Sequence, residues 1–382
     1  MRKKIGLLLP TRPQDGGQHQ YALLIMNALV KKKDADYDLV AFCGNDYWRK
    51  WCKKKGVRYI KHSMPDISTK ERLFNYRFPL PAKLYYTYMT SFGKTIRAEK
   101  IDILFSTQQG TYLPNYAVKL ISPVHDLMHR YEPDFPEVKD SFESRELHMK
   151  SLAKYTTCIL VDSKVGKRQF EESYIKTKNG RPHIISLPFI APEHIQKTEE
   201  AYIEVPNKYV FYPAQFWKHK NHMNLIKAIQ ILKESLSDIH LVLVGSERNN
   251  CREIKKYILD NGLERHVTIL GFVSDENITY LYRHAVGLIM PSYFGPTNIP
   301  PLEAMALGCP VAVSNKYAMP EQVGRAGLLF HPDSPEEMAD CIKKLWTDDN
   351  LREKMRKYGY QRIKTWTKEK FEKKLYKIID TI

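Results

Sequence analysis

Residues 291–315 read Pro291-Ser-Tyr-Phe-Gly-Pro-Thr-Asn-Ile-Pro-Pro-Leu-Glu-Ala-Met-Ala-Leu-Gly-Cys-Pro-Val-Ala-Val-Ser-Asn315, and this stretch decides the fold. An apolar strand that begins at Gly287 leads into a turn of Gly, Pro, Thr and Asn. A helix that carries Glu303 follows, and another strand begins at Pro310. A loop between the carboxyl end of a strand and the amino end of a helix is where an open α/β sheet holds anionic ligands. We therefore expect an α/β protein with an anion-binding loop here.

The same alternation of short apolar runs and longer amphipathic stretches covers the whole chain and predicts βαβα units around parallel sheets. In the first half, the expected strands are 5–9, 37–42, 57–59, 103–106, 120–124, 157–161 and 183–186, with helices notably at 18–31 and 142–155. In the second half, the expected strands are 209–212, 239–244, 267–270, 286–290 and 311–314, with helices at 221–235, 251–261, 275–284, 301–307 and 335–347. The periodicity breaks near residues 187–206. Because 382 residues are too many for one core, we expect two Rossmann-like domains, at 1–190 and 191–359.

Composition narrows the class of protein. The hydrophobic fraction of 43% is that of a globular chain, and no apolar run approaches the roughly 20 residues that span a bilayer. The run that ends at Pro10 is too short for a signal peptide, so we interpret it as a buried strand of an unprocessed protein. The six cysteines are scattered without paired spacing, which is typical of a reducing cytoplasm and argues against zinc or a disulfide framework.

The net charge of +17 is uneven, because residues 1–100 contain 21 Lys and Arg against 8 Asp and Glu. Such a surface attracts nucleic acid, anionic lipid or phosphorylated substrates, and charge alone does not choose among them. Asn45 can cap a helix in which Trp48, Trp51 and Cys52 share a face among lysines. This helix either lies at an anionic membrane surface or packs its tryptophans on the sheet. The sequence leaves both alternatives open.

Two segments carry a resemblance to a known family. Residues 291–315 resemble the donor-site signature of family 4 of the retaining nucleotide-sugar glycosyltransferases. Residues 212–225, Tyr-Pro-Ala-Gln-Phe-Trp-Lys-His-Lys-Asn-His-Met-Asn-Leu, look like that family's strand, loop and helix that grip the diphosphate. The resemblance is dense in the second domain and sparse in the first. It implies the GT-B fold, with two Rossmann-like domains facing across a cleft and a terminal helix, about 360–382, that packs back on the first domain.

The departing diphosphate gains negative charge, which a lysine and helix amino termini can stabilise. Lys220 lies between a strand end and a helix that Asn221 can cap, and it keeps the place of the family's lysine. Gln215 occupies the place of the family's arginine and brings no charge. Glu303, at the first turn of the expected helix, matches the second glutamate of the family's paired motif, which holds the ribose. The resemblance thus assigns catalytic roles to Lys220 and Glu303.

Gly295 stands where the family usually has the first glutamate. Thr297, Asn298 and Ile299 follow, and their amides or side chains could donate hydrogen bonds to the transferred sugar in its place. We therefore expect a variant donor loop. Pro296, within the same loop, has no amide hydrogen.

Further candidates lie at other strand ends. Gly16 and Gly17 join the first strand to the first helix and let the backbone approach a phosphate or acceptor closely. His125 follows the strand 120–124, where the resemblance implies a contact with the donor sugar beside the reacting carbon. Phe272 and Val273 are expected to form a wall for the nucleotide base.

Together these residues predict a metal-independent, retaining hexosyltransferase without a cofactor. The donor would be a GDP- or UDP-linked mannose- or glucose-type sugar, and the acceptor a glycan or polyprenyl-linked glycan of cell-surface polysaccharide or lipopolysaccharide synthesis. The expected location is cytoplasmic, with peripheral contact to the inner membrane face, and we expect no nucleic-acid partner. The alternatives are a sugar-nucleotide epimerase of the same fold, or an inactive relative that binds glycans or membranes.

Overall fold

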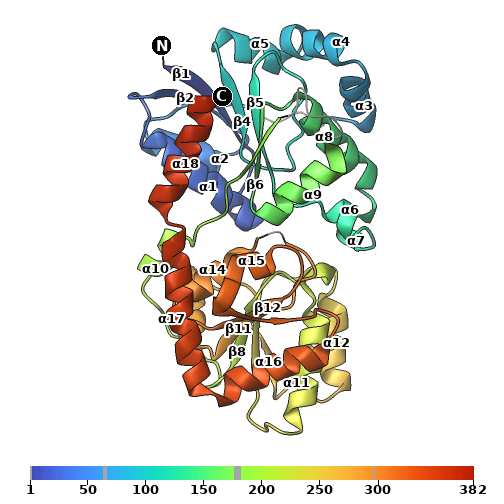
Figure 1. Ribbon diagram of the computed structural model, residues 1–382, viewed down its shortest axis with the longest axis vertical. Coiled ribbons are helices and arrows are strands. Elements are labelled where there is room, and N and C mark those ends of the chain that lie inside the picture. The colour runs from blue at the N-terminus through green and yellow to red at the C-terminus, as the bar shows by residue number, and fades with distance from the viewer. Residues whose placement is uncertain (1, 63–66, 176–181, 296) are drawn as a thin grey trace. The chain divides into compact units, whose positions relative to one another are not determined.

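The computed structural model describes residues 2–62, 67–175, 182–295 and 297–382. The chain divides into two compact units. The first contains residues 1–133, 138–188 and 372–382, and the second contains 134–137 and 189–371. Each is an α/β unit built on one parallel sheet (Figure 1).

The sheet of the first unit has seven strands in the order β3-β2-β1-β4-β5-β6-β7, all parallel. The strands are β1 (Lys3–Leu9), β2 (Tyr37–Cys43), β3 (Arg58–Lys61), β4 (Ile103–Ser106), β5 (Lys119–Val124), β6 (Cys158–Val161) and β7 (His183–Ser186). The central strands are nearly continuous apolar runs, because helices cover both faces of a parallel sheet. The chain order reverses between β1 and β4, where doubly wound sheets place ligands.

Helices and short turns connect these strands. They are η1 (Pro13–Asp15), α1 (Gly17–Val30), α2 (Asp46–Lys54), α3 (Thr69–Arg77), α4 (Pro79–Leu84), the π-helical turn η2 (Tyr85–Met89), α5 (Ser91–Ala98), α6 (Met128–Tyr131), α7 (Pro136–Lys139), α8 (Phe142–Tyr155) and α9 (Lys164–Tyr174). The group from α3 to α5 has no counterpart among the helices named from the sequence.

The sheet of the second unit has six parallel strands in the order β10-β9-β8-β11-β12-β13. The strands are β8 (Val210–Pro213), β9 (Leu241–Val244), β10 (Val267–Ile269), β11 (Gly287–Met290), β12 (Val311–Ser314) and β13 (Gly327–Phe330). The helices and turns are α10 (Glu193–Lys197), η3 (Lys218–Lys220), α11 (His222–Lys233), α12 (Cys251–Asp260), α13 (Asp275–His284), α14 (Ile299–Ala306), α15 (Met319–Val323), η4 (Gly324–Ala326), α16 (Pro335–Thr347) and α17 (Asp349–Thr365). Here the order reverses between β8 and β11.

Most expected strands and helices form within one or two residues of their expected bounds, and the two-sheet α/β architecture is confirmed. The sequence analysis missed β13. Its apolar run of Gly-Leu-Leu-Phe is short, and because it is the edge strand two of its four positions are half-buried and one is exposed. Asn221 does stand at the cap position of α11, but its side chain does not cap the helix. Its amide instead donates to the carbonyl oxygens of Pro291 and Pro332.

The terminal helix α18 (Lys368–Thr381) packs on the first unit from Glu372 onward, and lies beside α1 in Figure 1. The Tyr376 hydroxyl donates to the carbonyl of Ala28 at 2.7 Å, and the Tyr37 hydroxyl donates to Asp380 at 2.9 Å. The Lys31 ammonium forms an ion pair with Glu372, in the part of the helix that belongs to this unit, at 2.7 Å. Helix α17 thus belongs to the second unit, and α18 belongs to the first unit from Glu372 onward.

Helix α2 begins after Asn45, whose side chain caps it as expected. Trp48 and Cys52 are completely buried, and the Trp48 indole donates to the Thr11 carbonyl at 2.8 Å. This helix therefore packs its tryptophan on the sheet, and the alternative of a membrane-facing Trp48 is wrong.

Across the four described ranges, no helix is both long and apolar enough to cross a membrane.

Candidate active site

The loops after β8 and β11 meet at the switch point of the second sheet. The Tyr293 amide donates to the His219 carbonyl at 2.9 Å, and the Ser292 hydroxyl donates to the Phe294 carbonyl at 2.6 Å. Asn221 ties the first loop to Pro291 in the second loop. These bonds fix the two loops against each other at the carboxyl edge of the sheet, which is where the fold places a ligand.

Lys220 lies at the end of η3, and its ammonium group donates to the Asn298 side-chain oxygen at 3.3 Å. Asn298 is itself fixed, because its amide donates to Gln322 at 3.0 Å and its carbonyl accepts from the same side chain at 2.6 Å. Asn298 is also the residue before α14, so the positive end of that helix dipole lies at the same place. Two sequence-predicted residues thus come together, with a cation and a helix amino terminus side by side.

Gly295 has a backbone φ of +143°, a conformation that L side chains rarely adopt. A Cβ at this position would lie 2.2 Å from the side-chain nitrogen Nδ2 of Asn298. The loop is therefore shaped for glycine, and Asn298 fills the space in which a side chain at residue 295 would start. A side chain at residue 295 would therefore require Asn298 to move. Pro296 lies outside the described residues.

Glu303 is half-buried, and one of its oxygens accepts a hydrogen bond from the Tyr282 hydroxyl at 2.8 Å. Helix α14 begins at Ile299, so Glu303 stands in its second turn and not in the first turn as the sequence analysis expected. Burial raises the pKa of Glu303 to about 7, against a smaller opposing effect of the Tyr282 hydroxyl. No basic residue in the described ranges forms an ion pair with it. Such a carboxylate can accept ligand hydroxyls.

Gln215 takes part in a small cluster with two residues that sequence reasoning missed. Its side-chain oxygen accepts from the Trp217 indole at 2.8 Å and from the Arg248 guanidinium at 3.2 Å. The Arg248 guanidinium also lies over the Trp217 ring, 5.2 Å from its centre. An exposed arginine from the loop after β9 therefore brings a positive charge to the position of Gln215.

The other candidates of this unit have distinct surroundings. The Thr297 hydroxyl is buried and has no hydrogen-bond partner among the described residues, so it has a donor and an acceptor to offer a ligand. Phe272 is 87% exposed, whereas Val273 packs partly on the core. Ile299 is the first residue of α14 and half-buried. Only Phe272 presents an open apolar ring.

In the first unit, the junction of β1 and α1 is an open glycine turn. Gly16 has φ of +59° and precedes α1, which begins at Gly17. A Cβ on Gly16 would meet nothing within 4 Å, so the backbone is accessible from that side. Gln18 accepts a hydrogen bond from Gln108 at 2.5 Å, which ties this turn to the loop after β4. The turn therefore leaves backbone open at the switch point of the first sheet.

His125 follows β5, and its partner is Asp162, which the sequence analysis did not name. Val124 pairs with Val161 in the parallel register, so the next residue of each strand lies at the same edge. The His125 Nδ1 atom lies 3.0 and 3.1 Å from the two Asp162 oxygens, and the Tyr21 ring packs edge-on at 4.7 Å. Burial lowers the pKa of His125, but the Asp162 carboxylate outweighs this effect and leaves the pKa raised. Asp162 thus fixes the orientation of the imidazole through its Nδ1 atom.

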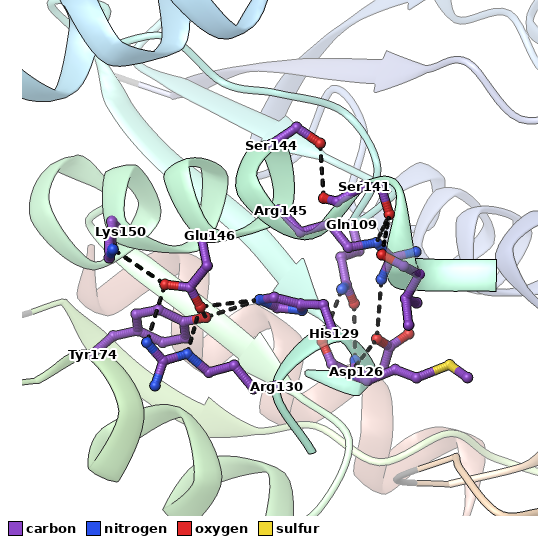
Figure 2. A network of polar contacts seen from close by, with 12 residues as sticks. Gln109, Asp126, His129, Arg130, Ser141, Ser144, Arg145, Glu146, Lys150 and Tyr174 are labelled. Atoms are coloured by element: carbon purple, nitrogen blue, oxygen red, sulfur yellow. Dashed lines mark hydrogen bonds and ion pairs between the residues drawn. The ribbon is translucent and has the colours of Figure 1, made fainter. Parts of the chain in front are cut away.

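A polar network supports the backbone that carries His125 (Figure 2). The Gln109 side chain accepts from the amides of His125 and Asp126 and donates to the Asp126 carbonyl. Further along, Glu146 on α8 accepts from Arg130 and from the Tyr174 hydroxyl. These partners outweigh burial and lower the pKa of Glu146 to about 2. Because the charged groups of this network pair with one another, we infer that the network holds the loop in place.

No group of three His, Cys, Asp or Glu side chains that could hold a metal ion occurs in the described part of the chain.

The second unit also matches a known protein family. Residues 195–362 match the model of the family named glycosyl transferases group 1. The matched region contains Gln215, Lys220, the loop after β11 and Glu303. Residues 195–362, which make up most of the second unit, are therefore similar to the group 1 glycosyltransferases.

Relatives and solved structures extend the likeness. The O-antigen chain mannosyltransferase B of Escherichia coli is 31% identical over 146 residues, which are 38% of either chain. The O-antigen chain mannosyltransferase RfbU of Salmonella typhimurium is 25% identical over 336 residues, 86% of this chain and 87% of that one. The crystal structure of Anabaena HepE in complex with UDP and glucose is 16% identical and matches with a TM-score of 0.69 over the full length of both chains. The chain has the GT-B type of α/β fold that this likeness shows.

Proposed function

We propose that this glycosyltransferase moves a mannose- or glucose-type hexose from a nucleoside-diphosphate sugar to a glycan or polyprenyl-linked glycan, in the synthesis of a cell-surface polysaccharide. The observation that supports it best is the Lys220–Asn298 contact at the amino end of α14. A lysine and a helix terminus together suit a diphosphate. The names of the two mannosyltransferase relatives support a mannose-type sugar, and the HepE complex supports a nucleoside diphosphate.

In this proposal, Glu303 accepts hydrogen bonds from the ribose hydroxyls. Arg248 adds the charge that Gln215 lacks, and Phe272 contacts the base. Thr297 exchanges hydrogen bonds with the sugar, in place of the glutamate that Gly295 replaces. His125, oriented by Asp162, contacts the sugar beside the reacting carbon. Each role uses a chemical group whose surroundings fit it: a half-buried carboxylate, an exposed guanidinium, an exposed ring and a buried hydroxyl.

The transfer we propose retains the configuration of the sugar and uses no metal ion. The bond between the sugar carbon and the diphosphate oxygen breaks while a bond to the acceptor oxygen forms on the same face. The acceptor's proton passes to the departing diphosphate. Lys220 stabilises the charge that grows on the leaving group. Gly295 leaves no carboxylate at the position where the family has its first glutamate, so the proposal includes no covalent intermediate at that residue.

We further propose that the protein acts on the cytoplasmic side, at the inner face of the membrane. A polyprenyl-linked acceptor is held there, and the basic first 100 residues suit an anionic surface.

The test is a thermal-shift screen of GDP, UDP and their mannose and glucose derivatives, followed by product analysis with the sugars that bind. A ligand that binds only the native state raises its melting temperature. We expect one nucleotide to stabilise the protein, and the sugar to remain unchanged without acceptor. Conversion of the free nucleotide sugar into an isomer would indicate the epimerase alternative, and no stabilisation by any nucleotide would contradict the proposal.

A further inference from the structure

Exposed apolar side chains concentrate in one segment of the first unit. Seven of the sixteen large exposed hydrophobic residues of the described chain lie between positions 73 and 89. They are Leu73, Phe78, Leu80, Leu84, Tyr85, Tyr88 and Met89, here called the α3–η2 surface. The other nine are scattered over the remaining sequence. In Figure 1 the helices α3, α4 and α5 follow one another along one edge of this unit. A concentration of this kind marks an interaction surface.

The backbone holds these side chains outward. Helix α4 continues directly into η2, and on its inner face Ala82, Tyr86 and Thr87 are buried. The Thr87 hydroxyl accepts from the Ala117 amide at 2.9 Å, which fixes the rotation of the helix. On the outer face, Leu80 is 67% exposed and Met89 66% exposed. A helix that is apolar on both faces needs a partner for the second face.

Positive charge surrounds the same residues. Residues 67–98 contain six Lys and Arg and one acidic residue, Glu71. The Glu71 carboxylate is occupied at the start of α3, where it accepts from the Ser68 amide and hydroxyl. Lys83 is exposed within α4, between the two outward-facing leucines, and the Arg97 guanidinium lies over the Tyr88 ring at 4.4 Å. Aliphatic and basic side chains are therefore interspersed on one surface.

We propose that the α3–η2 surface binds an anionic lipid bilayer. Leucine and methionine side chains would enter the acyl boundary while Lys83 and its basic neighbours contact lipid phosphates. A second copy of the chain is a poor occupant, because two surfaces with this net charge repel each other. A soluble glycan is also a poor occupant, because exposed aliphatic side chains offer it no hydrogen bonds. The surface differs from the Trp48 helix, whose tryptophan is buried.

The decisive experiment is flotation of the full chain with phosphatidylcholine vesicles, with and without phosphatidylglycerol. We expect binding only to the anionic vesicles. Leu80→Ser combined with Met89→Ser should lower the partition coefficient by about tenfold or more, because two large side chains no longer leave water. Lys94 is exposed on the neighbouring helix α5. Replacement of Lys83 and Lys94 by glutamine should lower the partition coefficient roughly fivefold for each charge.

A matched control is Leu259→Ser combined with Ile231→Ser in the second unit, where the side chains are 63% and 43% exposed. This variant should float like the unchanged protein. Equal flotation of the Leu80/Met89 variant, or no flotation of the unchanged protein, would overturn the proposal. Flotation with phosphatidylcholine alone would overturn its electrostatic part.

This proposal rests on the proposed function in one respect, because a polyprenyl-linked acceptor is what brings the protein to a membrane. Vesicle binding needs no nucleotide sugar, so the two can fail separately. Stabilisation by a nucleotide sugar should be the same in the Leu80/Met89 variant and in the unchanged protein. Loss of flotation with nucleotide binding retained would therefore concern this surface alone.

Discussion

Both sheets carry polar residues at the carboxyl ends of their strands, but the charged residues there have different kinds of partner. At the edge of the first sheet, His125 lies against Asp162, so a partly buried base has a buried acid beside it. At the edge of the second sheet, Glu303 is hydrogen-bonded by a neutral hydroxyl and Lys220 contacts a neutral amide. An internal ion pair orients its members, whereas a carboxylate held by a neutral hydroxyl, such as Glu303, can still be stabilised by a polar ligand. The comparison predicts ligand binding mainly at the second edge and positioning at the first.

Lys220→Ala should have the largest effect. Removal of the cation that faces the leaving group should lower the rate of sugar transfer by about 10²–10³-fold. Release of the nucleoside diphosphate from the donor is the measurement. Lys218→Ala, in the same short turn with an exposed side chain, is the matched control and should keep the rate. Near-normal transfer by Lys220→Ala would remove the basis of the comparison.

Glu303→Gln should weaken nucleotide-sugar binding by about tenfold or more at pH 8, because charged acceptors hold hydroxyls more strongly. With a pKa of about 7, the carboxyl is protonated at pH 6 and must lose its proton to accept both hydroxyls. Affinity of the unchanged protein should therefore rise from pH 6 to pH 8, while that of the glutamine variant stays flat. Calorimetry with an intact nucleotide sugar measures both. A parallel rise in the two proteins would assign the effect to another group.

The same carboxyl has a consequence for stability. Its pKa is higher in the folded chain than in the unfolded chain, so the folded state holds more protons between about pH 4.5 and pH 7. The stability that this group contributes is present below that range and is lost as the pH rises through 7. The difference in melting temperature between the glutamine variant and the unchanged protein should grow in favour of the variant over this interval.

Asp162→Asn should change the titration of His125 and leave nucleotide binding intact. The charged groups that face His125 are Asp162 and Asp126, and the Tyr21 ring covers it from α1. Without the Asp162 charge, burial dominates and the pKa of His125 should fall below its usual value. NMR titration of the imidazole measures the shift, and the pH profile of transfer should move with it. An unchanged titration would show that Asp162 does not orient the ring electrostatically.

The sequence was sufficient for the features that depend on local pattern. Apolar runs marked the buried strands, and turn residues marked the loops that carry Lys220, Asn298 and His125. It could not supply contacts between strand ends that are far apart in the chain. Asp162 reaches His125 only through the pairing of β5 with β6, and Tyr282 reaches Glu303 from another helix. Parallel register creates the first pair, and the packing of α13 beside α14 creates the second; the sequence pattern specifies neither.

The Trp48 helix shows that composition can also suggest a surface that the fold buries. Composition marked the Trp48 helix as a candidate membrane surface, but the indole found a carbonyl partner inside the fold. The α3–η2 surface has an ordinary mixture of Leu, Phe, Tyr and Met, and only the exposure of these side chains in the fold separates it from a core segment. Burial of an amphipathic segment is decided by what packs against it, which lies elsewhere in the chain.

Arg248→Ala should have the smallest effect, because this side chain is exposed and its charge is screened. If Arg248 supplies the charge that Gln215 lacks, its removal should weaken nucleotide-sugar binding by roughly fivefold, and added salt should diminish the difference. The double variant Gln215→Arg with Arg248→Ala returns one guanidinium to the same place and should recover most of the affinity. Recovery would show that the second edge needs a charge at this position but not from a particular strand. Equal weakness in the single and double variants would instead mean that Arg248 acts only by packing on Trp217.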